Sequence, residues 1–171
     1  MAVERISKLF KRPVEVTPEQ LGAALMELTT ESLNDFVDRV AKDRSLLGGV
    51  EAPVFFAELV ALQAFGVRHA VGRRGLDAAV AERVTRAFAG RYAEFREVFD
   101  GLTLAPDEVE ARIAVYAGSG NDEDVTRMRV GPPFALFCGQ QSPMAATSGA
   151  ALFREHYLAV LKLLDRARLE D

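Results

Sequence analysis

The sequence predicts an all-α fold, a bundle of about six helices around a buried central helix at residues 52–72. Apolar residues recur at intervals of three and four along most of the chain. No segment shows the sustained two-residue alternation of a half-buried strand. At 171 residues the chain is most simply one helical domain, residues 1–171, in which residues 1–12 form a short N-terminal amphipathic segment.

The N-terminal segment, residues 3–12, combines an apolar helical face with basic flanks. The face is formed by Ile6, Leu9 and Phe10, and the flanking bases are Arg5, Lys8, Lys11 and Arg12. Such a piece folds back on the core, docks on a partner protein or lies on a membrane surface. Because two helical turns are a weak anchor, the pattern favours the core, and membrane contact is the weakest of the three readings.

The first long helix has a clear start at Thr17-Pro18, where Gln20 completes a capping box. Its apolar face runs on to Val40, but a step of five residues separates Leu28 from Leu33. This interruption predicts either a bend or two separate helices, and the glycine pair at residues 48–49 ends the element.

The central helix, residues 52–72, is apolar nearly all round, which is typical of a buried helix. The next helix begins at Asp77 and carries one apolar stripe, formed by Val80, Val84, Phe88, Tyr92, Phe95 and Phe99. A shorter helix follows from Pro106 to Gly118. The last helix begins at Ser142-Pro143 or at Thr147 and is expected to continue through Leu169.

Residues 131–143, GPPFALFCGQQSP, interrupt this helical pattern with the chain's single cysteine. The segment from Phe134 to Cys138 is apolar enough to be buried as one short turn. We therefore expect a hydrophobic plug that would form the wall of any cavity, and an unreactive buried thiol at Cys138.

Composition excludes several classes of protein. The net charge of −4 and the pI of about 5.3 argue against a broad nucleic-acid-binding surface. One cysteine excludes an intramolecular disulfide and a multi-cysteine zinc site. Charges at the N-terminus do not fit a signal peptide, so we expect a soluble, cytoplasmic protein. Abundant alanine and arginine are typical of bacterial genomes rich in G and C.

Four polar residues have the chemistry of a site. Glu58 lies inside the most apolar helix, so it must be paired, protonated or facing a polar cavity, and a salt bridge to an arginine of a neighbouring helix is the favoured interpretation. His69 and His156 either line a shared pocket or are ordinary buried histidines. The Glu-x-x-His spacing of di-iron bundles is absent, and we expect no metal and no cofactor.

Two sets of candidate binding residues follow. A small-molecule pocket would use Glu58, His69, Phe134, Phe137, Cys138 and His156. An anion or an acidic partner would contact Arg68, Arg73 and Arg74. These three arginines lie in the last turn of the central helix and at its exit, where the helix dipole alone also explains positive charge.

The leading prediction is a non-catalytic helical interaction or adaptor domain that self-associates or binds another protein. It depends on apolar surface that six helices would leave uncovered, at Phe36, Phe95, Phe99, Phe153 and Tyr157. The alternative is a small-molecule-binding protein or enzyme with a pocket between helix 52–72, segment 131–143 and helix 143–169.

Overall fold

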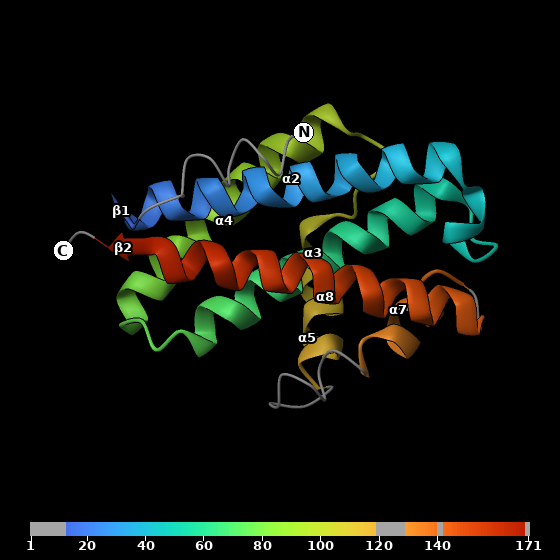
Figure 1. Cartoon of the computed structure of the whole chain (residues 1–171). Coiled ribbons are helices and arrows are strands. Elements are labelled where there is room, and N and C mark those ends of the chain that lie inside the picture. Colours follow the sequence, from blue (N-terminus) through green and yellow to red (C-terminus); the bar gives the residue numbers. More distant parts are fainter. Residues whose placement is uncertain (1–12, 119–128, 140–141, 170–171) are drawn as a thin grey trace.

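The computed structural model describes residues 13–118, 129–139 and 142–169 and confirms the all-α fold. Six α-helices lie within these residues, with α3 packed among α2, α5, α7 and α8 (Figure 1). The predicted amphipathic segment at residues 3–12 lies outside the described residues, and so does most of the polar stretch after Gly118.

Helix α2 spans Pro18–Lys42 and begins with the predicted capping box. The amide of Gln20 donates to Thr17 Oγ1 at 3.2 Å, and the Thr17 amide donates to Gln20 Oε1 at 2.9 Å. The two-helix alternative is wrong, because α2 is continuous through Thr29. The glycine pair does not end α2 directly either: the helix stops at Lys42 and a 3-10 turn, η1 (Arg44–Leu47), precedes the left-handed Gly48.

Helix α3 spans Ala52–Arg73 and is the buried central helix that the sequence predicts. Its length and hydropathy would suit a membrane span, but 78% of its most apolar window is buried inside the protein. That burial is typical of a core helix. Burial of Phe55, Leu59 and Leu62 against the surrounding helices supplies much of the hydrophobic stabilisation of the core.

Helix α4 (Ala78–Val98) packs mainly on α2 and crosses behind it in Figure 1. The closest approach is at Gly22, where an added Cβ would meet the carbonyl oxygen of Val84 at 2.5 Å and the amide nitrogen of Phe88 at 2.9 Å. Arg83 of α4 pairs with Glu19 one turn earlier on α2. The two helices therefore run in the same direction and touch most closely near their N-terminal ends.

Helices α5 (Pro106–Ala117), α7 (Gly131–Phe137) and α8 (Pro143–Arg166) complete the bundle. The predicted short turn before Cys138 is the seven-residue helix α7, which starts at Gly131 because both prolines fit its first positions. Gly149 of α8 lets the two helices approach, since an added Cβ would come within 2.3 Å of the Phe134 ring.

The sequence prediction misses two short strands. β1 (Val14–Val16) pairs in parallel with β2 (Ala167–Leu169), so the ends of the described chain lie together. The last helix consequently ends at Arg166, three residues before the predicted end at Leu169. A strand of three residues is too short to leave a two-residue periodicity.

The expected surplus of apolar surface is largely absent. Phe36, Phe153 and Tyr157 are each at most 2% exposed, so the bundle does bury these three of the five aromatic residues. Phe95 and Phe99 differ, because both are only partly buried. The predicted stripe on α4 is thus buried from Val84 to Tyr92 and partly open beyond it.

Candidate functional site

Glu58 is held inside the protein by Arg112 of α5. The Nε of Arg112 donates to Glu58 Oε2 at 2.9 Å and its Nη2 donates to Oε1 at 2.9 Å, the two-pronged geometry that suits a carboxylate. The side chain of Glu58 is 4% exposed and that of Arg112 is 23% exposed. The hydrogen bonds to Glu58 raise the pKa of Arg112. The predicted salt bridge between Glu58 and a neighbouring helix is confirmed.

Phe137 and Cys138 of the α7 region lie beside this ion pair. The Arg112 guanidinium carbon stands 4.1 Å from the Phe137 ring centroid, a cation–π contact. Cys138 is 6% exposed, and burial, followed by the charge of Glu58, raises the pKa of its thiol to about 12. A thiol with that pKa is not a nucleophile at neutral pH.

Tyr116 closes the same region from α5 and is fully buried. Its ring meets Phe137 edge-on at 5.7 Å and Phe65 at 5.6 Å between centroids. Burial is the main cause that raises the pKa of its hydroxyl. That hydroxyl has no hydrogen-bond partner among the described residues, and the side chains packed on the ring are aromatic.

His156 of α8 is 1% exposed and binds a different element, α2. Its Nε2 lies 3.1 Å from Thr29 Oγ1, and that hydroxyl donates its proton to the Leu25 carbonyl at 2.9 Å. With the Thr29 hydroxyl donating to Leu25, the tautomer protonated on Nε2 completes the pair by donating to Thr29 Oγ1. Burial lowers the pKa of His156 to about 3, so the ring is neutral and its bare Nδ1 points into the interior beside Gly66.

His69 of α3 lies in an aromatic setting. Its ring centroid is 5.5 Å from that of Phe65 and 5.8 Å from that of Tyr157. Phe65 connects it to Tyr116 on one side and to Phe153 on the other. His69 is thus part of the aromatic packing between α3, α5 and α8.

The six predicted pocket residues are therefore only partly brought together. Glu58, Phe137 and Cys138 share one region, Phe134 packs on Phe55 with centroids 5.0 Å apart, and His156 binds α2. Of the six, His156 lines a cleft of about 480 Å³ between α2 and α8. Within the described residues, Glu58 is enclosed by its pairing with Arg112 and His156 by its contact with Thr29.

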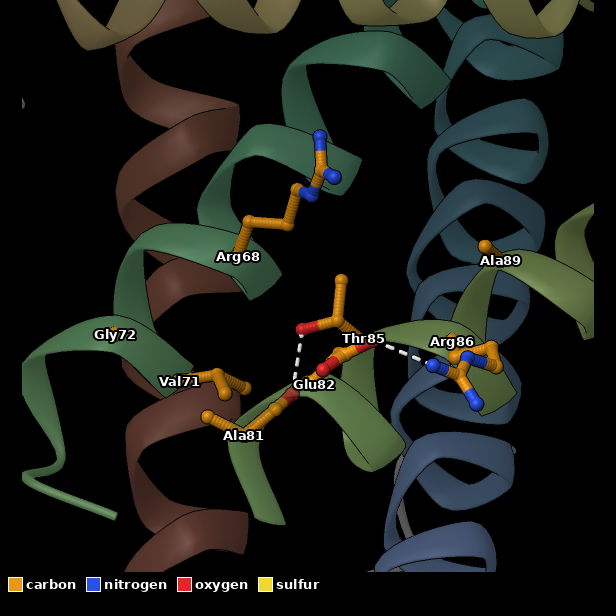
Figure 2. A pocket seen from close by; sticks show the side chains of 8 residues that line it. All are labelled: Arg68, Val71, Gly72, Ala81, Glu82, Thr85, Arg86 and Ala89. Carbon is orange, nitrogen blue, oxygen red and sulfur yellow. Dashed lines mark hydrogen bonds and ion pairs between the residues drawn. The ribbon is translucent and has the colours of Figure 1, made fainter. Parts of the chain in front are cut away.

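The three arginines at the end of α3 are engaged by separate neighbours. Arg68 pairs with Glu110 of α5 at 2.6 Å, and Arg74 pairs with Asp165 of α8 at 2.8 Å. Arg73 contacts another group as well. Figure 2 shows Arg68 at the edge of a shallow hollow of about 440 Å³ between α3 and α4, where Thr85 and the Glu82–Arg86 pair line the other wall.

A groove of about 590 Å³ lies between α2 and α4. We call it the α2–α4 groove. It begins just beyond the close contact at Gly22 and is lined on α2 by Ala23, Met26, Glu27, Thr30 and Glu31. On the other side, the lining residues of α4 and its C-terminal end are Arg91, Glu94, Phe95, Val98 and Phe99.

Apolar side chains line this groove and acidic side chains rim it. The rings of Phe95 and Phe99 stack with centroids 4.5 Å apart, and the side chain of Val98 is 75% exposed. Arg91 is paired with Glu94 at 2.7 Å, and this pairing, with a smaller contribution from Glu27, raises the pKa of Arg91. The groove is thus lined by apolar side chains together with Glu27, Glu31, Glu94 and Arg91.

Comparison of the chain with known protein families, with curated proteins and with solved structures found no match. The functional argument therefore depends on the geometry alone.

The geometry offers little for catalysis within the residues that the structure describes. The buried carboxylate is paired with Arg112, the buried thiol is protonated, and the buried imidazole is neutral with an enclosed Nδ1. In the same residues, no three His, Cys, Asp or Glu side chains are grouped to hold a metal ion. What remains exposed and organised is the α2–α4 groove.

Several residues that matter here were not singled out from the sequence. Arg112 is next to Ile113, which lies on the predicted buried face of its helix. That position could have indicated Arg112 as the partner of the buried Glu58. Thr29 marks the break in apolar spacing, which is where α2 receives His156. Met26 and Val98 carried no distinguishing signal, because only the packing of α4 on α2 places them together.

Proposed function

We propose that this protein is a non-catalytic interaction domain that binds an amphipathic helix of a partner protein in the α2–α4 groove. The observation that carries the proposal is the exposed Phe95–Val98–Phe99 surface beside three carboxylates. Grooves of this kind accept a helix whose apolar residues, spaced by three and four, enter the groove while its polar residues face outward.

The charges favour a basic occupant. Glu27, Glu31 and Glu94 line the groove together with Arg91, which pairs with Glu94. Lysine or arginine residues flanking the bound helix would therefore complement the rim, speed the encounter and make binding sensitive to salt. An acidic helix with the same apolar face would be repelled.

No observation favours the small-molecule alternative to the same degree. It requires that Glu58, His69 and His156 open into one cavity, whereas each is enclosed by different neighbours. We also propose a reducing, cytoplasmic setting for the interaction, in keeping with the single, buried Cys138.

A binding measurement tests the proposal. The probe is a fluorescently labelled peptide with the sequence of residues 1–13, a basic amphipathic sequence that this chain itself supplies. The receptor is the full chain carrying Ile6→Ser, Leu9→Ser and Phe10→Ser, so that its own basic segment does not compete. We expect saturable binding by fluorescence anisotropy at concentrations on the order of 10–100 μM.

Two matched controls make the result specific to the groove. Val98→Asp in the receptor should weaken binding about tenfold or more, because it places a charge where apolar contact is needed. A peptide with Lys8 and Lys11 replaced by Glu should bind far more weakly. Equal binding of both peptides, or binding unaffected by Val98→Asp, would show that the groove is not the helix-binding surface.

A further inference from the structure

A small cavity of about 90 Å³ lies between α3, α4 and α5. It shares Arg68, Thr85 and Ala89 with the shallow hollow of Figure 2, so the two spaces adjoin at these residues. We propose that this cavity binds a small branched monocarboxylate, with the alkyl tail inside and the carboxylate on Arg68. The site is independent of the proposed function, because its described lining residues all differ from those of the α2–α4 groove.

The inner wall of the cavity is apolar and buried. It is formed by side chains from all three helices that are each at most 6% exposed, namely Ala64, Phe88, Tyr92 and Val109. The hydroxyl of Tyr92 does not make this wall polar, because it already donates to the Leu104 carbonyl at 3.1 Å. The interior of the cavity therefore favours an alkyl group over a polar one.

The mouth of the cavity presents a cation. Arg68 lies at the edge that the two spaces share, and its Nη1 donates to Glu110 Oε2 at 2.6 Å. Thr85 stands across the hollow from Arg68 (Figure 2), and its hydroxyl already donates to the Ala81 carbonyl at 2.8 Å. A guanidinium has several N–H donors in a planar fork, so Arg68 can hold a second carboxylate beside Glu110 or in its place.

The ion pair that a ligand would meet at this mouth is exposed. The side chain of Arg68 is 37% exposed and that of Glu110 is 60% exposed. Pairs of this kind contribute little to stability, because water solvates both charges well when they separate. An incoming carboxylate can therefore compete with Glu110 for Arg68. A phosphate fits less well, because Glu110 beside the same guanidinium would repel its second negative charge.

The volume of the cavity sets the size of the tail. A water molecule occupies about 30 Å³ in the liquid, so the cavity of about 90 Å³ suits a tail of about three or four carbon atoms. Isovalerate, whose tail is an isobutyl group, is therefore the probe. Isovaleramide has the same tail without the charge, and acetate has the same charge without the tail, so the two compounds separate the two parts of the recognition.

A titration of the full chain followed by amide chemical shifts tests the proposal, with the ionic strength held constant. We expect isovalerate to cause saturable shifts concentrated at residues 85–93 and 109–113, with a Kd of about 1–10 mM. Isovaleramide and acetate should each bind at least about tenfold more weakly. The absence of saturable shifts, equal binding of isovaleramide, or shifts concentrated in another part of the protein would each overturn the proposal.

Two substitutions at the mouth should change the affinity for isovalerate in opposite directions. Arg68→Gln removes the cation and should weaken binding about tenfold or more. Glu110→Gln removes the carboxylate that competes for Arg68 and should strengthen binding about twofold to fivefold. A loss of affinity in Glu110→Gln, or unchanged affinity in Arg68→Gln, would contradict the assignment of Arg68 as the anion contact.

Two further variants show whether the adjoining spaces are the place of binding. Ala89→Leu, at an exposed position of α4, fills the junction between the cavity and the hollow and should weaken binding about tenfold or more. The matched control is Arg74→Gln, which removes an exposed pair with Asp165 and lines neither space. It should leave the affinity unchanged within about twofold. Equal losses in Arg74→Gln and Arg68→Gln would mean that the anion responds only to the overall charge, and would overturn the proposal.

Discussion

A glutamate, an arginine and a phenylalanine lie together at two places in this protein, one buried and one exposed. Inside, Glu58 and Arg112 form a two-pronged pair over the Phe137 ring, and the side chains are 4% and 23% exposed. On the surface, Arg91 and Glu94 form a monodentate salt bridge beside Phe95. The side chain of Glu94 is 65% exposed and that of Arg91 is 56% exposed. The first group is complete and closed, whereas the second lies beside uncovered apolar surface.

The two groups differ in how accessible they are. In the interior, the Glu58 carboxylate is paired with Arg112, and the Phe137 ring packs on the guanidinium. In the α2–α4 groove, charges and rings lie together but remain accessible. We therefore expect substitutions in the interior to change stability and substitutions in the groove to change binding.

The largest expected effect is at Arg112. Arg112→Met leaves the Glu58 carboxylate buried without its partner, and the free energy of unfolding should fall by about 3–5 kcal/mol. The matched change in the groove, Arg91→Met, removes an exposed pair and should cost less than about 1 kcal/mol. Urea unfolding of both variants provides the comparison, and equal losses would show that the two groups do not differ as described.

A second substitution tests where the groove begins. In Gly22→Ala the new Cβ would lie 2.5 Å from the Val84 carbonyl oxygen, so α4 must move away from α2. We expect a loss of about 1–3 kcal/mol despite the better helix propensity of alanine. The control is Gly90→Ala on α4, which has no atom within 4 Å of the added Cβ and should be neutral or stabilising by up to about 1 kcal/mol. Similar effects of the two changes would contradict the close contact.

The interior should also be sensitive to acid through His156. Burial lowers the pKa of His156 from 6.5 to about 3 in the folded protein, so between these values the unfolded chain binds more protons. Its contribution to stability is full above about pH 6.5 and is lost as the pH falls toward 3. The free energy of unfolding should drop by about 2 kcal/mol between pH 7 and pH 5 from this group.

Comparison with His156→Gln isolates that contribution from the other titrating groups. The variant should be less stable at pH 7, and its stability should change less between pH 7 and pH 5. A difference between the two proteins that stays constant with pH would mean that His156 is not held neutral.

The smallest expected effect on stability is at Val98. Because its side chain is 75% exposed, Val98→Asp should change the free energy of unfolding by less than about 0.5 kcal/mol. The same variant should lose most of its affinity for the basic peptide. A variant that is markedly destabilised would place Val98 in the packed structure and not in a binding surface.

Periodicity and caps predicted most of the fold. Thr17, Asp77 and Pro106 each mark the start of a helix as expected, and an all-apolar helix is central. The two three-residue strands could not be found, because a pairing between Val14–Val16 and Ala167–Leu169 depends on the bundle bringing the two ends together. The break in apolar spacing at Thr29 resembled the end of a helix. Its cause is a buried threonine whose hydroxyl pairs with His156, and in sequence this polar position looks the same as a chain reversal.

The site was harder to predict than the fold. Glu58 and its arginine partner could be anticipated from the cost of burying a carboxylate, but the residues selected as a shared pocket lie in separate parts of the core. Phe95 and Phe99 were among five aromatic residues expected to be exposed, and nothing in their spacing separated them from Phe36 or Phe153. The crossing of α4 on α2 at Gly22 makes that distinction, and it is a property of tertiary packing.

We propose that recognition takes place in the α2–α4 groove and not in the interior. The most direct test is an amide chemical-shift map by NMR of the full chain carrying Ile6→Ser, Leu9→Ser and Phe10→Ser, titrated with the peptide of residues 1–13. We expect saturable shifts concentrated at residues 23–31 and 91–99. Shifts centred on Glu58, Arg112 and Cys138, or no saturable shifts, would contradict it.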